Sequence, residues 1–154
     1  MAWMAAAALG WSAAPVHAFF FSRSSVRTTV QRLVEAIENE NLEAVKACIS
    51  PRFLAGNPEI PGRLDDAFEK FDATRISYKI ASIREADGIA AVKLNWTKTT
   101  TNPMNNWTYR DIGNDVVMYF NAESPHQLVG LEDGSLFGIS FLLATRIVIP
   151  APDE

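Results

Sequence analysis

The residue in this sequence that most suggests chemistry is an aspartate inside an aromatic-rich segment. Asp111 lies in the run WTYRDIG, where it is the only carboxylate. A carboxylate in an apolar cavity loses hydration, which moves its pKa toward neutrality and suits it to act as a general base. Tyr78 or Tyr109 could then donate a hydrogen bond to an oxyanion developing on a substrate. The alternative is that Arg110 and Asp111 lie at a bend or a sheet edge, where they are solvated or ion-paired.

The other reactive side chains are few and isolated. His126 follows Pro125 in a predicted turn, which favours an exposed turn residue over a catalyst. Cys48 is the only cysteine, so we expect a small core residue, with pairing between two chains as the alternative. One histidine beyond the leader and no cysteine pair argue against a zinc site, and no nucleophile-elbow motif is present. We therefore expect no metal and no cofactor.

The amino-terminal half has helical periodicity. Its apolar residues recur at steps of three and four, with one slip: Val26, Val30, Leu33, Val34, Ile37, Leu42, Val45, Ile49 and Phe53. The pattern predicts helices over residues 26–38 and 42–49, with Ser24 or Ser25 capping the first and Asn41 the second. Pro51 is expected to end the second helix.

A turn-rich loop over residues 56–62 is followed by a third predicted helix, residues 63–73. This interpretation places Asp65 and Asp66 in the first turn of that helix, where the helix dipole favours negative charge. That placement accounts for the acidic pair without a metal ion, the alternative being metal binding.

From residue 74 onward the apolar period becomes two. Residues 74–85 and 89–101 read as two strands joined by a hairpin turn at Asp87-Gly88. The second strand places four apolar side chains on one face: Ala90, Val92, Leu94 and Trp96. These alternating residues predict a sheet with one buried face.

Two further strands complete the predicted sheet. Residues 107–122 read as a long strand that bends at Gly113-Asn114, where a bulge would let the sheet curl. A short strand follows over residues 127–131, and Asp133-Gly134 marks another turn. Helices that precede hairpin-connected strands indicate an α+β fold, three helices packed on a bent antiparallel sheet of four to five strands.

Composition sets the size of the fold and excludes one class of partner. A chain of 154 residues with 48% hydrophobic residues is sized for one domain with an ordinary core. The net charge of −4, with no Lys/Arg cluster along any predicted element, argues against a nucleic-acid partner.

The two ends of the chain differ from the domain between them. Residues 1–18 are uncharged and end in Val16-His17-Ala18, which a signal peptidase could accept, although Lys and Arg are missing near Met1. We predict a cleaved signal peptide and an exported protein, periplasmic or secreted. An uncleaved membrane anchor over residues 1–21 and a cytosolic extension are the alternatives. Residues 142–154 form a tail that we expect to be a strand or packed arm.

The order of elements resembles the nuclear transport factor 2-like superfamily, which includes the polyketide cyclase-like (SnoaL-like) proteins and ketosteroid isomerase. The segments that carry the resemblance are VQRLVEAIENENLEAVKACISPRF, LDDAFEKF, ISYKIASIREADGIAAVKLNWT, DVVMYF and HQLVGLEDGSLFG. The resemblance places a domain of this kind over residues 19–141. It implies a bent sheet that wraps around the long helix and leaves a cone-shaped pocket.

In such a cone, the resemblance places pocket-wall residues on the helices and the inner face of the sheet. The candidates for ligand contact are Tyr78, Trp96, Tyr109 and Met118, with Asp111 as the candidate catalytic residue. The sequence offers no clear counterpart of the isomerase base on the early hairpin.

Three functions follow as hypotheses. The first is an exported, non-enzymatic domain that binds a small apolar molecule or a protein partner in or beside a conical pocket. The second is a small-molecule isomerase, cyclase or dehydratase that uses Asp111 together with a tyrosine. The third is a structural module that forms a homodimer through the outer face of the sheet. A membrane is a partner only if the leader stays uncleaved.

Overall fold

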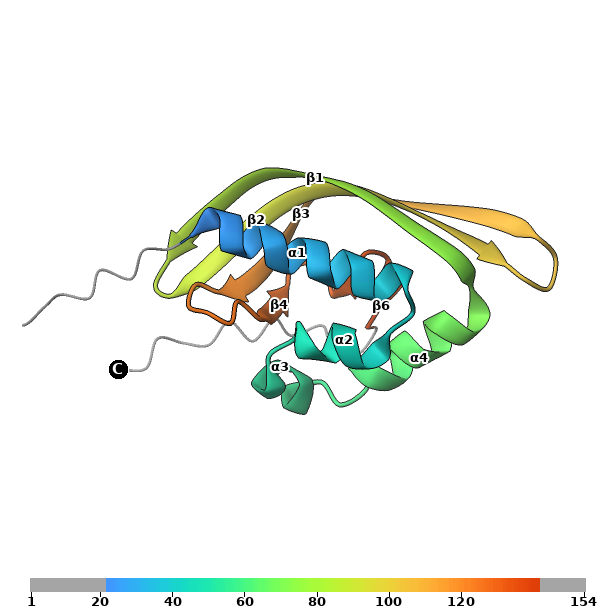
Figure 1. The fold of residues 1–154 in the computed structure, drawn as a ribbon, viewed down its shortest axis with the longest axis horizontal. Helices are drawn as coiled ribbons and strands as arrows, with labels where there is room; N and C mark the ends of the chain where they lie inside the picture. The colour runs from blue at the N-terminus through green and yellow to red at the C-terminus, as the bar shows by residue number, and fades with distance from the viewer. Residues whose placement is uncertain (1–21, 142–154) are drawn as a thin grey trace, which may run out of the picture.

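Four helices precede six strands in the computed structural model, which describes residues 22–141 (Figure 1). The helices are α1 (Arg23–Glu38), α2 (Leu42–Ala47), α3 (Pro51–Gly56) and α4 (Ile60–Lys70). The strands are β1 (Asp72–Ala86), β2 (Ile89–Asn102), β3 (Trp107–Asn121), β4 (Leu128–Leu131), β5 (Ser135–Leu136) and β6 (Ile139–Ser140). The predicted leader, residues 1–18, and the tail, residues 142–154, lie outside the described residues. The α+β class predicted from the sequence is confirmed.

Helix α1 is the long helix against which the sheet packs. Its apolar stripe is buried as the periodicity predicts: Val26, Val30, Leu33, Val34, Ala36 and Ile37. The prediction of its start was wrong by three residues, because Ser22 rather than Ser24 or Ser25 is the N-cap. The Ser22 hydroxyl accepts a hydrogen bond from the Ser25 backbone N–H at 3.3 Å.

The prolines begin helices where the sequence suggested only a stop or a loop. Pro51 is the first residue of α3, and Pro61 lies in the first turn of α4. Proline suits the first helical turn because its backbone nitrogen needs no partner there. Since α4 therefore begins at Ile60, the predicted start at residue 63 was wrong. Asp65 and Asp66 lie in the middle of α4 and not in its first turn.

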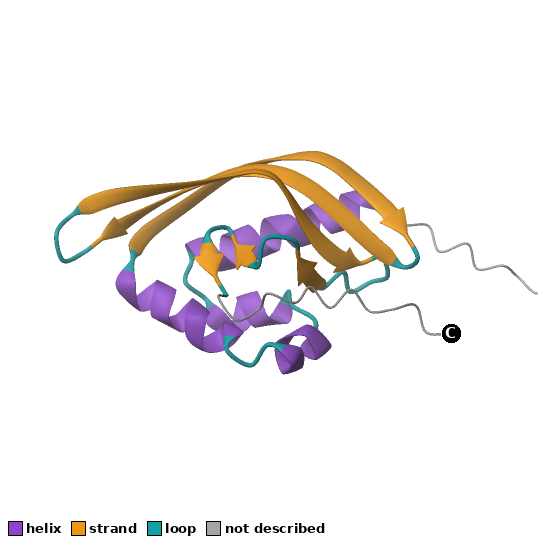
Figure 2. Ribbon diagram, turned by 180° about the vertical axis from the view of Figure 1, so that it is seen from behind, coloured by secondary structure: helices purple, strands orange, loops and turns teal. Residues whose placement is uncertain are grey.

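The main sheet has the strand order β1-β2-β3-β4, all antiparallel, and it arches over the helices (Figure 2). The predicted bend in β3 is confirmed by a register shift, since Leu94 pairs with Val116 whereas Trp96 pairs with Gly113. The extra residue in β3 leaves a backbone N–H at Asp115, which donates to the Asn95 side-chain oxygen at 2.7 Å. The backbone N–H freed by the bulge thus has a hydrogen-bond partner, and the bulge bends β3 so that the sheet curls around α1.

Three hydrogen bonds tie the two edge strands of the sheet to the helical half of the chain. The Glu38 carboxylate at the end of α1 accepts a hydrogen bond from the backbone N–H of Ile76 on the edge strand β1, at 2.7 Å. On the other side of the sheet, the Leu128 N–H donates to the Cys48 carbonyl at 2.8 Å, and the Ser50 N–H donates to the Leu128 carbonyl at 2.9 Å. The β5–β6 hairpin lies between the sheet and the helices (Figure 2).

The concave side of the sheet is filled by apolar side chains. The largest fully buried residues come from α1, from the inner face of the sheet and from the β5–β6 hairpin; they include Leu33, Ile37, Leu94, Met118, Phe120, Leu136, Phe137 and Phe141. None of the helices within residues 22–141 is long and apolar enough to cross a membrane.

Candidate functional site

A cleft of about 280 Å³ lies between α4, the outer halves of β2 and β3, and the β5–β6 hairpin. The β2–β3 hairpin projects from the molecule next to α4 (Figure 1). We call this cleft the α4 cleft. Its walls come from α4, from the outer halves of β2 and β3, and from the β5–β6 hairpin; the lining residues are Arg63, Asp66, Ala67, Lys70, Phe71, Lys98, Thr100, Tyr109, Asp111, Gly138, Ile139 and Ser140. It combines charged groups of both signs with an apolar wall.

The polar centre of the α4 cleft is an ion pair between two strands. Lys98 on β2 and Asp111 on β3 are register partners, and the Lys98 Nζ lies 3.4 Å from the Asp111 Oδ2. The lysine is only 6% exposed, whereas the aspartate side chain is 51% exposed. Burial lowers the pKa of Lys98, and the neighbouring Asp111 carboxylate partly opposes that effect. Within residues 22–141, this buried ammonium therefore has a single counter-ion, which faces solvent.

Sequence alternation explains why a lysine is buried here. Strand β2 presents Ala90, Val92, Leu94 and Trp96 to the core, and the same period of two carries Lys98 to that face. The alternation is visible in the sequence, and the apolar part of the pattern ends at Trp96. Lys98 is therefore the functional candidate that sequence reasoning missed, and the signal that could have found it is a charged residue in phase with an apolar face.

The remaining walls shape the space next to this ion pair. The ring of Tyr109 meets that of Phe71 edge to face, with centroids 5.8 Å apart. Gly138 has a φ of +78°, and a Cβ built there would lie 3.2 Å from the Asp111 Oδ2 and 3.1 Å from the Trp96 ring. Glycine at this position thus permits both the turn and the close approach of β5–β6 to the carboxylate.

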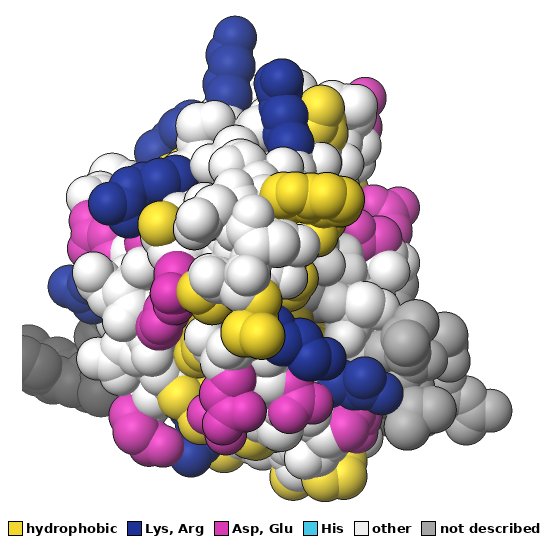
Figure 3. Space-filling view, turned by 90° about the vertical axis from the view of Figure 1, so that its right-hand side faces the viewer, with side chains coloured by type: hydrophobic (Ala, Val, Ile, Leu, Met, Phe, Trp, Pro, Cys, Tyr) yellow, Lys and Arg dark blue, Asp and Glu magenta, His cyan; other side chains and the backbone are white. Residues whose placement is uncertain are grey.

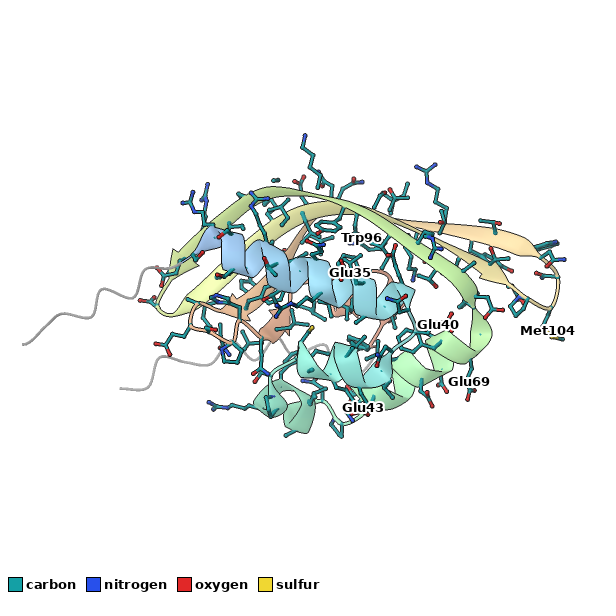
Figure 4. All side chains as sticks on the ribbon, viewed as in Figure 1. Glu35, Glu40, Glu43, Glu69, Trp96 and Met104 are labelled. Atoms are coloured by element: carbon teal, nitrogen blue, oxygen red, sulfur yellow. The ribbon has the colours of Figure 1, made fainter. Side chains whose placement is uncertain are left out.

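The residues predicted to contact a ligand fall into two groups. Tyr109 lines the α4 cleft together with Asp111. Trp96 and Met118 are buried in the core, with Trp96 beneath the sheet (Figure 4). Tyr78 is half-buried and packs against the core. Its pKa is raised by burial and by the Glu35 carboxylate, against the opposing effect of Arg27.

Trp96 closes the space behind the α4 cleft. Its ring meets that of Phe137 edge to face at a centroid distance of 5.9 Å. Its indole N–H is buried, with no hydrogen-bond partner among the described residues. The Cβ position of Gly113 coincides with the indole, so the ring lies directly against the β3 backbone.

The expectation for His126 was wrong. The ring is only 9% exposed, and its Nδ1 hydrogen-bonds to the Asn121 backbone carbonyl at 3.0 Å. The turn folds back onto α1 and α2. This contact between distant segments buries the ring and cannot be seen in the sequence. Cys48 is half-buried, and burial raises the pKa of its thiol. Within residues 22–141, no three His, Cys, Asp or Glu side chains come together in a way that could hold a metal ion.

The end of the molecule that carries the hairpin has a mixed surface. Hydrophobic, basic and acidic side chains are interspersed on this face, and no charge of one sign covers it (Figure 3). Met104, at the hairpin tip, is 91% exposed, and Trp107, Tyr109 and Ile112 on β3 are also exposed (Figure 4).

Comparison with solved structures identifies the fold. A conserved protein from Planctomyces limnophilus matches with a TM-score of 0.58 at 13% identity, covering 68% of this chain and 88% of that one. A proposed dehydratase of the nuclear transport factor 2-like family from Streptomyces avermitilis matches with a TM-score of 0.55 at 12% identity, covering 68% and 89% of the two chains. A nuclear transport factor 2-like superfamily protein from Salmonella enterica matches with a TM-score of 0.52 at 14% identity, covering 69% and 84%.

These identities show the fold alone, and the chain has a nuclear transport factor 2-like fold. No protein-family model matches the sequence, and neither does any curated protein.

Proposed function

On this nuclear transport factor 2-like fold, we propose that the chain is an exported protein that binds a small amphipathic organic molecule in the α4 cleft without converting it. The observation that carries the proposal is the buried Lys98. An ammonium taken out of water is unfavourable unless it is well paired. Its one counter-ion, Asp111, is loosely placed at 3.4 Å and faces solvent.

A ligand in the cleft would give that ammonium a second hydrogen-bond partner. A ligand with a carbonyl or carboxylate oxygen could accept a hydrogen bond from Lys98, while its hydrocarbon part contacts Phe71, Tyr109 and Ile139. Arg63 and Lys70 against Asp66 add a small excess of positive charge at the rim, which favours a polar group of negative character. The pattern of one buried polar anchor and an apolar wall is typical of small-molecule sites.

The test is native mass spectrometry of the protein purified from an exporting host. We expect a small-molecule adduct on the wild type that Lys98→Met reduces at least about tenfold, because the variant keeps the side-chain volume and removes the anchor. Lys93→Met is the matched control, since Lys93 is exposed on the opposite face of the same strand. An adduct that Lys98→Met retains at wild-type occupancy would place the ligand elsewhere.

A proton-transfer enzyme is the second candidate, and the lowered pKa of Lys98 favours it. A lysine of this kind can give up or take up a proton closer to neutrality than an exposed one. Asp111 could remove a proton next to a substrate carbonyl while Lys98 donates to the carbonyl oxygen. The β-hydroxyl would then leave as water by taking the proton that Asp111 had removed, which forms the carbon–carbon double bond and restores the carboxylate.

The enzyme reading is tested with 4-hydroxybutan-2-one in D2O, followed by NMR. An enzyme would speed deuterium uptake next to the carbonyl, and Asp111→Asn would remove that acceleration while Asp115→Asn on the same strand would not. Equal rates of deuterium exchange with the wild type, Asp111→Asn and Asp115→Asn would argue against the enzymatic function for this substrate class. The binding function would not be affected.

A further inference from the structure

A second hollow of about 310 Å³ lies away from the α4 cleft and shares no residue with it. We call it the α1–α2 cleft. Its lining comes from α1, from the end of α2 and from the loop between β3 and β4: Ser25, Thr28, Thr29, Arg32, Ala47, Cys48, Ser124, Pro125, His126 and Gln127. The Leu128 N–H to Cys48 carbonyl bond and a 3.3 Å bond from the Gln127 amide to the Ala47 carbonyl hold the loop against α2.

The charge in the α1–α2 cleft is unbalanced. Arg32 brings a permanent positive charge, and none of the described residues that line the cleft is an aspartate or glutamate. Arg32 takes part in neither of the two ion pairs found within residues 22–141. Glu35 borders a neighbouring hollow together with Arg32, and its carboxylate accepts a hydrogen bond from Gln31 at 2.8 Å. The guanidinium fork is therefore available for a carboxylate.

His126 supplies an acceptor beside that cation. A backbone carbonyl can only accept a hydrogen bond, so the 3.0 Å contact with the Asn121 carbonyl places the proton on Nδ1. A ring that carries its single proton on Nδ1 presents Nε2 as an acceptor. The ring is nine-tenths buried, which fixes its orientation, and no described residue is bonded to Nε2.

The threonines of α1 extend the same pattern. The Thr28 hydroxyl donates to the Ser24 carbonyl at 3.0 Å, and the Thr29 hydroxyl donates to the Ser25 carbonyl at 3.3 Å. Both hydroxyl protons are used, so the two oxygens face a ligand as acceptors. The cleft thus combines one cation with several acceptors, which does not suit a bare inorganic anion such as phosphate.

We propose that the α1–α2 cleft binds a small hydroxycarboxylate. The carboxylate pairs with the Arg32 guanidinium, and the hydroxyl donates to the His126 Nε2. A hydroxyl fits better than an ammonium, because none of the carboxylates of residues 22–141 lines the cleft to neutralise a second positive charge. This site is independent of the function proposed for the α4 cleft.

The test uses three molecules of nearly equal size, L-lactate, propionate and L-alanine, with inorganic phosphate as a fourth probe. Each is titrated into the full chain, and the amide NMR signals of Thr29, Cys48 and Gln127 are followed. We expect saturable shifts with lactate, at least about threefold weaker binding of propionate because it lacks the hydroxyl, and weaker binding still of alanine. Tighter binding of phosphate or alanine than of lactate, or no saturation with lactate, would overturn the proposal.

Two variants assign the roles. Arg32→Gln is expected to weaken lactate at least about tenfold, whereas Arg27→Gln on the same helix, outside the cleft, leaves it unchanged. His126→Phe is expected to remove the preference for lactate over propionate and to keep propionate binding. An equal loss of lactate affinity in the Arg32 and Arg27 variants would show a general effect of charge. It would overturn the proposed site whatever the result for His126→Phe.

Discussion

At the scale of single residues, the burial of Lys98 leads to a prediction about how stability depends on pH. Its pKa is lowered in the folded protein, so at neutral pH the unfolded chain holds this proton more readily than the folded one. The resulting penalty on the folded state is present at neutral pH and is lost as pH rises toward the ordinary lysine value of 10.5. Relative to Lys98→Met, the wild type should therefore gain stability on going from about pH 7 to about pH 10.

Urea unfolding of both proteins at the two pH values measures this difference. Other titrating groups are shared by the two proteins and largely cancel. Lys93→Met controls for the loss of one positive charge on β2, since Lys93 is exposed on the other face. A wild-type stability that falls relative to Lys98→Met over this range would show that the ammonium is better stabilised in the fold than in water.

The titration of Tyr78 tests the electrostatics next to α1. Burial raises the pKa of its phenol above 10.0, the Glu35 carboxylate raises it further, and Arg27 lowers it. We expect Glu35→Gln to bring the Tyr78 pKa closer to its ordinary value and Arg27→Gln to raise it. The absorbance of the phenolate, taken as the difference from Tyr78→Phe, follows this titration. Identical midpoints in the two charge variants would mean that neither group lies near the ring.

The sequence identified one half of the candidate ion pair. Asp111 stood out as a carboxylate among aromatic residues, and Tyr109 beside it lines the same cleft. Lys98 and the burial of His126 were missed. Lys98 continues the apolar alternation of β2, and its pairing with Asp111 follows from the β2–β3 register. The burial of His126 depends on a turn that packs on α1 and α2, which are far away in the chain. Whether Tyr78, Trp96 and Met118 touch a ligand stays a prediction.

At the scale of elements, the bend of the sheet depends on a glycine. A Cβ at Gly113 would overlap the indole of Trp96, which is fixed in the core against Phe137. Gly113→Ala should lower the free energy of unfolding by about 1–3 kcal/mol, because the ring or the strand must shift. Urea unfolding measures the loss.

Gly62→Ala is the matched control for this substitution. Gly62 lies within α4, and a Cβ there meets nothing within 4 Å. Because alanine favours a helix over glycine, this variant should be unchanged or up to about 1 kcal/mol more stable than the wild type. If Gly113→Ala were as stable as Gly62→Ala, the close approach of Trp96 to β3 would not constrain the bend.

The strands were more predictable than the helix boundaries. Alternation in β1 to β3 and the Asp87-Gly88 turn are local signals, and the structure places these strands within two residues of the predicted limits at each end. Helix α3 was not predicted and α4 begins three residues before its predicted start, because the sequence pattern indicates a helix stop at Pro51 and a loop around Pro61. The same residues are compatible with the first turn of a helix, and tertiary packing decides between the two.

At the scale of the whole molecule, the fold does not determine the function. The helices-then-hairpins order was enough to indicate the nuclear transport factor 2-like fold, and the structural matches bear it out. The same fold carries binding proteins and enzymes, so its activity depends on the few polar groups in its clefts. The groups that we propose for this chain are Lys98 with Asp111 at one end and Arg32 with His126 near α2.

Export is the prediction that concerns the whole chain. Residues 1–18 carry no charge and end in Val16-His17-Ala18, where a signal peptidase requires small side chains. We expect the wild type and Phe19→Ala, from an exporting host, to lose these residues, whereas Ala18→Phe keeps them because a bulky ring blocks the peptidase. Intact mass gives the start of each protein. An intact wild type in the membrane fraction would mark residues 1–21 as an anchor, since that length spans about 30 Å of hydrocarbon as a helix. An intact wild type in the soluble fraction would remove export altogether.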